Sequence, residues 1–142
     1  MATKGELHKR LIIKNNISEL ERLVAFLESL QNEWNIPAST IPSINLALEE
    51  ALTNVIFYAF ENDDEQEIKL DFKLNNNQLT MIISDNGKPY DPTTKTDPDI
   101  NLSVKDRPVG GLGIFLIKQL MDEVSYQRKG NLNQLTLMIQ IG

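Results

Sequence analysis

The chain has 142 residues, of which 41% are hydrophobic and 24% charged, ordinary values for a globular protein. This length suits one hydrophobic core, so we expect residues 1–142 to form a single domain. The net charge of −6 argues against broad binding to nucleic acid or an anionic membrane, and the lack of cysteine excludes disulfides and thiolate metal sites.

The first half of the chain predicts a strand and a helix. Residues 6–14 alternate as a strand does, with Leu7, Leu11 and Ile13 as inward residues. Ser18 and Glu21 form a capping-box pair that opens a helix reaching to about residue 32. We expect its apolar stripe to belong to the core; the stripe consists of Leu20, Leu23, Val24, Leu27 and Leu30.

A second helix follows the connector at residues 34–42, with Pro42 in its first turn, and runs to about residue 60. Residues 66–74 and 79–84 predict two strands joined by three asparagines, which tolerate the positive φ of a hairpin turn.

A long polar stretch then leads to a third helix that opens with Gly110, Gly111 and Gly113. The strands at residues 124–128 and 132–141 form a closing hairpin. This order predicts a two-layer α/β sandwich, a mixed but mostly antiparallel sheet with helices on one face.

The second predicted helix has polar residues on one face of an otherwise apolar segment. Glu50 and Asn54 are four residues apart, so their side chains lie one turn apart on one face. Such groups are costly to bury unless they are satisfied, and Mg²⁺, which takes oxygen ligands and bridges to nucleotide phosphates, would satisfy them. The alternative is a helix face that is simply hydrated.

Three other features carry possible chemistry, each with a plain structural alternative. Asp85 and Gly87 directly follow a strand, where a carboxylate can accept from an exocyclic amine and a glycine admits a ring; a simple Asp-Asn-Gly turn is the alternative. Gly111 and Gly113 open a helix, which is a ready anion site, although such glycines also serve tight turns. Basic side chains in the long loop could reach phosphates or be merely solvated; they are Lys95, Lys105 and Arg107.

Taken together, three motifs in this order resemble the N, G1 and G2 boxes of the GHKL ATPase superfamily. They are EEALTN, then DNG after a strand, then GGLG before a helix that ends in MDE. Within it, EALTN, DNGKPYDP and GGLGIFLIKQLMDEVSY look most like the anti-sigma-factor serine kinases of bacterial partner switching. The resemblance covers nearly the whole chain and implies the Bergerat ATP-binding fold, which agrees with the predicted order of elements.

The resemblance also implies a role for individual residues. Glu50 matches the general base, and Asn54 matches the Mg²⁺ ligand. Asp85 matches the acceptor of the adenine amine and Gly87 the glycine under the ring, whereas Gly111 and Gly113 match the phosphate-facing glycines. Residues 93–109 match the ATP lid, within which Arg107 is a candidate contact to ATP.

The chain departs from the family pattern at two positions. Tyr58 stands where many relatives carry a histidine, one turn after the asparagine. No arginine adjoins the glycine box, because Arg107 lies two residues further back. Both departures concern phosphoryl transfer rather than ATP binding.

The resemblance implies an ATP- and Mg²⁺-dependent serine/threonine protein kinase. Its expected partners are an anti-anti-sigma protein of the STAS type, which it phosphorylates, and a sigma factor, which it sequesters; a homodimer is also expected. The alternative is a nucleotide-gated binding module with little or no catalysis. A severed ATP-binding part of a histidine kinase is a third interpretation, disfavoured because no histidine-bearing helical hairpin precedes the first strand.

The longest apolar run, residues 55–60, is too short to span a membrane, so we expect a cytoplasmic protein.

Overall fold

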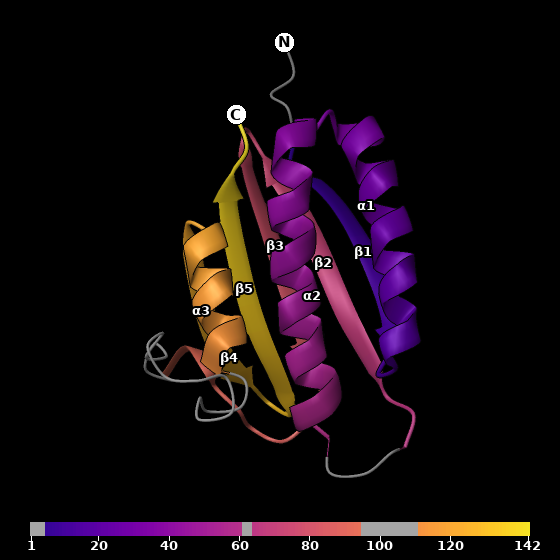
Figure 1. Ribbon diagram of the computed structural model, residues 1–142, viewed down its shortest axis with the longest axis vertical. Coiled ribbons are helices and arrows are strands. Elements are labelled where there is room, and N and C mark those ends of the chain that lie inside the picture. The colour runs from indigo at the N-terminus through magenta and orange to yellow at the C-terminus, as the bar shows by residue number, and fades with distance from the viewer. Residues whose placement is uncertain (1–4, 61–63, 95–110) are drawn as a thin grey trace.

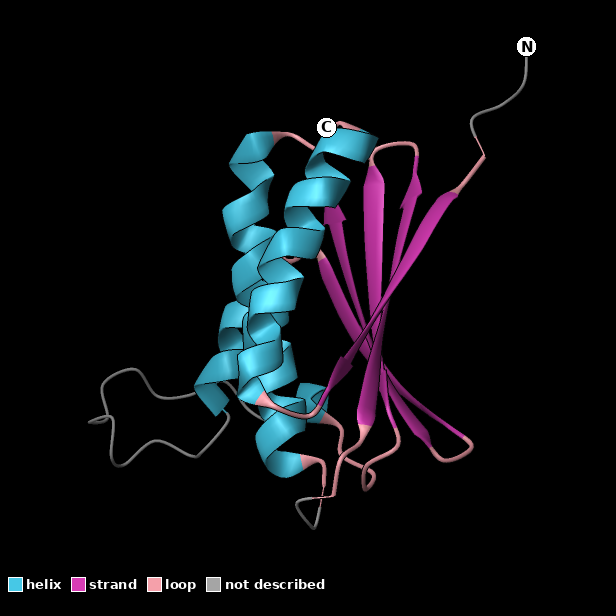
Figure 2. Cartoon of the chain, turned by 90° about the vertical axis from the view of Figure 1, so that its right-hand side faces the viewer, coloured by secondary structure: helices cyan, strands magenta, loops and turns pink. Residues whose placement is uncertain are grey.

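The computed structural model describes residues 5–60, 64–94 and 111–142, and these residues form a sheet with a layer of helices on one face (Figures 1 and 2). The strands are β1 (Leu7–Lys14), β2 (Glu67–Asn75), β3 (Gln78–Asp85), β4 (Glu123–Lys129) and β5 (Leu132–Gln140). The helices are α1 (Leu20–Trp34), α2 (Ile41–Tyr58) and α3 (Gly111–Leu120), with short 3₁₀ turns η1 (Ile17–Glu19), η2 (Ala38–Thr40) and η3 (Pro92–Thr94).

The strands are ordered β1-β2-β3-β5-β4, and every pairing among the described strands is antiparallel. The predicted two-layer sandwich with helices on one face is therefore confirmed. Two tight turns fix the hairpins: Asn76 adopts φ 56° between β2 and β3, and Gly130 adopts φ 61° between β4 and β5. Both residue types tolerate this left-handed conformation.

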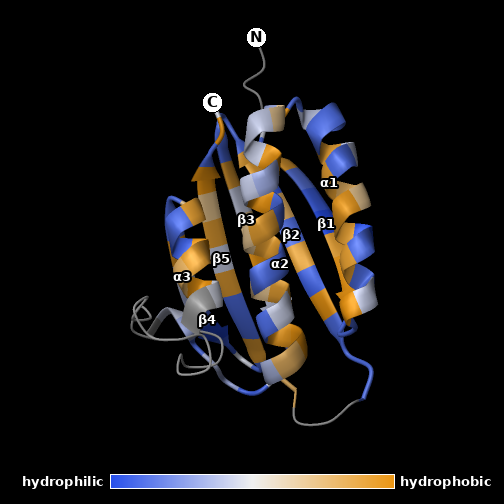
Figure 3. Ribbon diagram, viewed as in Figure 1, coloured by the Kyte–Doolittle hydropathy of each residue, from blue (hydrophilic) through white to orange (hydrophobic). Residues whose placement is uncertain are grey.

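The core lies between the two layers, and hydrophobic residues alternate with hydrophilic ones along the helices and strands that form it (Figure 3). Alternation along β2 buries Ile68, Leu70, Phe72 and Leu74 against the helices, while the intervening residues face the other side of the sheet. The middle of α2 contributes Ile44, Leu48 and Leu52, each 0% exposed.

The edge formed by β1 and α1 differs from the prediction at two side chains. Leu11 and Ile13 are buried as expected, but Leu7 is 45% exposed, and Val24 of α1 is 44% exposed. These two side chains are not core residues: Leu7 lies at the start of an edge strand, and Val24 belongs to α1, which lies at one edge of the helical layer (Figure 1).

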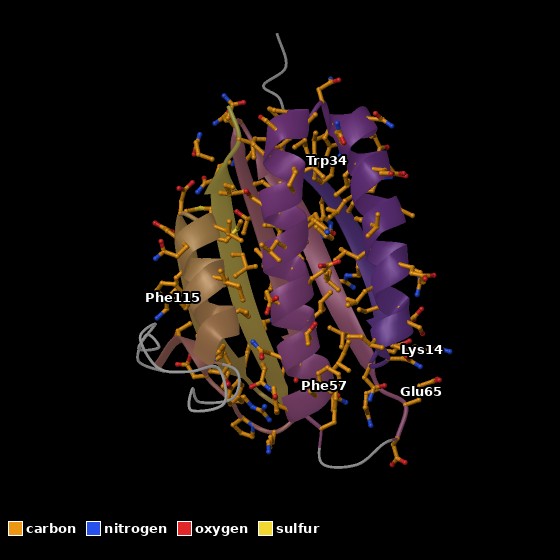
Figure 4. All side chains as sticks on the ribbon, in the orientation of Figure 1. Lys14, Trp34, Phe57, Glu65 and Phe115 are labelled. Atoms are coloured by element: carbon orange, nitrogen blue, oxygen red, sulfur yellow. The ribbon has the colours of Figure 1, made fainter. Side chains whose placement is uncertain are left out.

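The predicted capping box is also wrong. The chain enters α1 through η1, where the Asn16 side chain caps the turn by accepting from the Ser18 backbone N–H at 3.0 Å. Helix α1 itself shows no side-chain cap, and it continues to Trp34 before Asn35 ends it with φ 54°. Trp34 and Phe57 mark opposite ends of the helical layer (Figure 4).

Helix α2 begins and ends close to its predicted limits, whereas α3 ends at Leu120, before the MDE segment in which it was predicted to end, and Glu123 already begins β4. Pro42 lies in the first turn of α2, as expected, although no hydroxyl caps that helix: the Thr40 Oγ1 donates to the Pro37 carbonyl instead. The C-terminal end of α2, the N-terminal end of α3, the end of β3 and the start of β5 all lie at the lower end of the molecule in Figure 1. The candidate site is built at this end.

Candidate functional site

A pocket opens between α2, α3 and the sheet, with an empty volume of about 440 Å³ that includes its open mouth. Apolar side chains make most of its wall, and among the polar lining residues Asp85 and Asn133 are buried. This combination suits a flat ring with a few hydrogen-bonding atoms on its edge. The lining residues are Ala51, Asn54, Val55, Ala59, Ile83, Asp85, Tyr90, Pro92, Ile114, Ile117, Tyr126, Asn133 and Leu135.

Asp85, the last residue of β3, supplies the carboxylate of this pocket and is only 4% exposed. Its Oδ1 accepts from the Gly87 backbone N–H at 2.8 Å and from Asn133 Nδ2 at 3.0 Å. Burial raises the pKa of Asp85, and the hydrogen bonds from Asn133 and Gly87 and the charge of Arg128 oppose that rise. Asp85 is therefore a buried acceptor whose contacts with the protein are made through one oxygen.

Gly87 lies against the C-terminal end of α2. A Cβ at position 87 would come within 2.4 Å of the Ala59 carbonyl oxygen and 2.7 Å of its Cβ. The next residue completes the contact, because the Lys88 N–H donates to the same Ala59 carbonyl at 2.9 Å. The fold itself thus requires glycine here, which is a reason independent of any ligand.

Asn133 is a site residue that the sequence analysis did not identify. It lies opposite Asp85 in the β3–β5 register and is 5% exposed. The alternation of the strand could have predicted its burial, because Asn133 shares one face of the strand with Leu135, Leu137 and Ile139 and so faces the core. Its carboxamide donates to Asp85 Oδ1 and to the Lys88 carbonyl and accepts from the Tyr126 hydroxyl at 2.5 Å, Arg128 Nη1 at 3.2 Å and the Tyr90 N–H at 3.4 Å.

Arg128 of β4 joins this network to the loop after β3. Its Nη1 donates to the Gly87 carbonyl at 2.9 Å, and its Nε donates to the Gly130 carbonyl at 3.2 Å. Arginine suits this position because its planar guanidinium donates in several fixed directions at once. The Asp85–Lys88 loop is therefore held on one side by α2 and on the other by the β4–β5 hairpin.

Glu50 and Asn54 come together with the start of α3. A Cβ at Gly113 would lie 3.1 Å from Glu50 Oε2, 3.3 Å from Asn54 Nδ2 and 3.9 Å from Asn54 Oδ1. Both polar side chains are half-buried, and neither makes a hydrogen bond to another residue in the described part of the chain. Asn54 also lines the pocket that ends at Asp85. One helix thus carries two polar side chains to Gly113, and the second of them also lines the apolar pocket.

The oxygen atoms of Glu50 and Asn54 beside Gly113 fit Mg²⁺ without enclosing it. Within residues 5–60, 64–94 and 111–142, no three histidine or acidic side chains gather as a metal cage. Mg²⁺ bound with a nucleotide needs only one or two protein oxygens beside phosphates and water. Asn54 Oδ1, with the Glu50 carboxylate one turn away, can supply that number.

Some candidate residues fall elsewhere. Arg107, Lys95, Lys105 and most of the expected lid at 93–109 lie outside the described residues. Gly111 is the first residue of α3, at the helix end that faces Glu50 and Asn54 through Gly113. Tyr58 is 38% exposed and its ring lies 6.4 Å from that of Phe57, itself 59% exposed at the lower end of α2 (Figure 4).

Comparison with known proteins agrees with this arrangement. Residues 13–139 match the family of histidine kinase-like ATPase domains. The chain belongs to the histidine kinase-like ATPase family. The superfamily resemblance drawn from the three motifs is thereby confirmed.

Curated relatives are protein kinases. The chain is 33% identical over 109 residues to the serine/threonine-protein kinase BtrW of Bordetella bronchiseptica, covering 77% of this chain and 75% of that protein. It is also 33% identical over 102 residues to the serine-protein kinase RsbW of Listeria monocytogenes, covering 69% of this chain and 65% of that protein. The branch that the sequence indicated is therefore confirmed.

Two solved structures share the fold. The RsbU and RsbW domains of a Mycobacterium tuberculosis protein match with a TM-score of 0.66 at 16% identity, covering 94% of this chain and 32% of that one. A blue-light activated histidine kinase domain from Erythrobacter litoralis matches with a TM-score of 0.53 at 21% identity, covering 74% of this chain and 46% of that one. None of the helices in the described residues is long and apolar enough to cross a membrane.

Proposed function

We propose that this protein binds ATP with Mg²⁺ and transfers the γ-phosphoryl group to a serine or threonine hydroxyl of a partner protein. The observation that carries the proposal is the meeting of Glu50 and Asn54 with Gly113, beside a pocket that Asn54 and the buried Asp85 both line. This arrangement supports a nucleotide lying with its base against Asp85 and its phosphates at the start of α3, where N–H groups and the helix dipole favour negative charge.

Each side chain then has a defined task. Asp85 would accept from the exocyclic amine of adenine, and Asn54 would give an oxygen to Mg²⁺, which when bound would neutralise charge on the phosphates. Glu50 removes the proton from the acceptor hydroxyl, whose oxygen attacks the γ-phosphorus while the bond to the bridging oxygen of ADP breaks. ADP leaves, and the partner carries the phosphate ester.

The kinase relatives support a protein as the acceptor. In the anti-sigma branch that the motifs resemble, this acceptor is an anti-anti-sigma protein of the STAS type, and the kinase sequesters a sigma factor. We extend both partners to this chain, together with a homodimeric state, a cytoplasmic location and a single ATP-binding domain across residues 1–142.

A nucleotide-gated binding module is the second candidate function. Tyr58 favours it, because this residue at the end of α2 is a poor base near neutral pH and does not line the pocket. Such a module would bind its partner with an affinity that depends on the nucleotide, without transferring phosphate.

Incubation with labelled ATP and candidate STAS proteins from the same genome tests the proposal. For a kinase, Glu50→Gln keeps Mg²⁺–ATP and partner binding but lowers the rate of transfer at least about a hundredfold, because it removes basicity and little else. A binding module shows negligible transfer in both proteins.

Glu49→Gln is the matched control, because residue 49 lies about 100° around α2 from Glu50. This variant should transfer phosphate at nearly the normal rate. If transfer were slow in Glu49→Gln alone, Glu49 and not Glu50 would be the general base. Normal transfer in both variants would exclude both carboxylates as the base.

A further inference from the structure

The buried carboxamide of Asn133 has a partner on both of its polar atoms. Its Nδ2 donates to Asp85 Oδ1 at 3.0 Å and to the Lys88 carbonyl at 2.8 Å, while its Oδ1 accepts from Arg128 and Tyr126. A guanidinium can only donate and a carbonyl can only accept, so these partners allow one orientation of the amide. Asn133 therefore presents a donor, and never an acceptor, to Asp85.

This contact leaves one oxygen of Asp85 for a ligand. Oδ1 already accepts from the Gly87 N–H at 2.8 Å and from Asn133 Nδ2, which together use both of its lone pairs. Asp85 lines the pocket, and its Oδ2 accepts no hydrogen bond from any residue that the structure describes. A ligand N–H matches that oxygen, whereas a ligand carbonyl would face it lone pair to lone pair.

We propose that Asn133 is a positioning residue that sets base specificity, because it holds Asp85 as an acceptor and so selects a purine with a 6-amino group over one with a 6-oxo group. The inference rests on the proposed function for its ligand, an adenine nucleotide. Asn133 acts through Asp85 and need not touch the base. Arg128 supports it from β4 by donating to both the Asn133 Oδ1 and the Gly87 carbonyl.

Loss of the Asn133 amide would weaken this selection in two ways. Oδ1 of Asp85 would keep a single donor, so the carboxyl group could rotate about its χ2 bond. Burial would then also favour the protonated carboxyl, since one of the groups that stabilise the charge is gone. A protonated Asp85 can donate to a 6-oxo group as readily as it accepts from a 6-amino group.

Calorimetric titration with metal-free ADP and IDP, which differ at the 6-position of the purine, tests the inference. The unmodified protein should prefer ADP by about ten- to a hundredfold, the usual penalty for a buried mismatched polar group. In Asn133→Ala the ADP affinity should fall at least about tenfold, and the two affinities should come within about threefold of each other.

Asn133→Asp gives a readout that a purely structural role would not produce. The new carboxyl would lie against Asp85, and the pair would share one proton at low pH, restoring a donor to Oδ1. As the pH rises the pair ionises fully, and the second carboxylate then faces both Oδ1 and the Lys88 carbonyl without a proton. The ADP affinity of this variant should fall at least about tenfold between pH 5.5 and 8.5, whereas that of the unmodified protein should change little over this range.

Two further variants keep the test decisive. Tyr126→Phe removes one hydrogen bond to Asn133 and spares the fold, and it should reduce the ADP preference in the same direction by a smaller factor. Gln134→Ala, the next residue of β5 and on the opposite face of the sheet, should leave the preference unchanged.

The possible failures are distinguishable. Equal binding of ADP and IDP by the unmodified protein would overturn the base-reading role of Asp85 and with it the proposed function. A strong ADP preference that survives in folded Asn133→Ala, or equal losses for both nucleotides, would overturn the role of Asn133 alone.

Discussion

Gly113 and Glu50 face each other across the contact between α3 and α2, so closely that a single methyl group at position 113 would lie 3.1 Å from Glu50 Oε2. The same methyl group would lie 3.3 Å from Asn54 Nδ2. Both neighbours are ends of side chains, so they can move aside, but moving aside changes where their oxygens point.

Gly113→Ala should therefore weaken Mg²⁺–ATP binding while leaving the stability of the fold nearly unchanged. Alanine favours a helix over glycine by about 1 kcal/mol, which offsets the tight contact, so the melting temperature should change by only a few degrees. We expect Mg²⁺–ATP affinity to fall about tenfold, because the side-chain oxygens of Glu50 and Asn54 are displaced. Thermal unfolding and calorimetry measure the two effects, and unchanged affinity would place the phosphates away from Gly113.

Asn54→Ala should weaken Mg²⁺–ATP far more than metal-free ADP. The variant removes an oxygen ligand from an ion that tolerates few geometric errors, while the base contact at Asp85 stays in place. Titration of both ligands measures the difference, and a thermal scan checks that α2 is intact. Equal losses for the two ligands would make Asn54 a structural residue.

Gly87→Ala should destabilise the protein by about 1–3 kcal/mol, the usual range for forcing extra atoms into a tightly packed site. The reason is the 2.4 Å approach to the Ala59 carbonyl oxygen, a backbone atom that cannot rotate away. Urea denaturation measures the loss. Lys88→Ala, in the same loop but with an exposed side chain, should change stability by no more than about 0.5 kcal/mol.

Asp85→Asn should bind ADP at least about tenfold more weakly and yet gain stability at neutral pH. Burial raises the pKa of Asp85, so the folded state favours the protonated carboxyl and stability is lost as pH rises through the folded-state pKa. The advantage of the variant should therefore grow above the ordinary aspartate range of about pH 4 and then level off. Urea denaturation across pH measures this trend.

Asp71→Asn is the control of opposite sign. Burial alone would raise the pKa of Asp71, but the hydrogen bonds from Arg10 and His8 outweigh it and lower the pKa. This carboxylate contributes stability above its unfolded pKa that is lost as pH falls through its lower folded value. The variant should thus be less stable than the unmodified protein at neutral pH, and the deficit should shrink in acid.

Short-range patterns predicted most of the fold. Alternation located β2 and β5, and residue type located the turns at Asn76 and Gly130, because each depends only on neighbours in the chain. The same is true of Glu50 and Asn54, whose shared face follows from helical spacing. Val24 fits a helical stripe equally well, but α1 lies at an edge of the helical layer and leaves this side chain exposed, which no local pattern reveals.

The site was predicted less completely because its contacts join distant segments. Pairing of Asp85 with Asn133 depends on the β3–β5 register, and the residues are 48 positions apart. The contact of Gly87 with Ala59 likewise requires the end of α2 to lie beside the loop after β3. A buried asparagine in an alternating strand was the one available signal, and it indicated burial without indicating a partner.

The contact of the Lys88 N–H with the Ala59 carbonyl has a geometric consequence. It connects the loop after β3 to α2, the helix that also carries Asn54 five residues before Ala59. The spacing between Asn54 and this loop therefore follows the helical rise of about 1.5 Å per residue. Inserting one residue between Asn54 and Ala59 would lengthen α2 only slightly, but it would rotate Ala59 by about 100° around the helix axis relative to Asn54. The distance between Asn54 and the loop after β3 is therefore set by the regular geometry of one helix, and it would set the spacing between the metal and the base of a bound nucleotide.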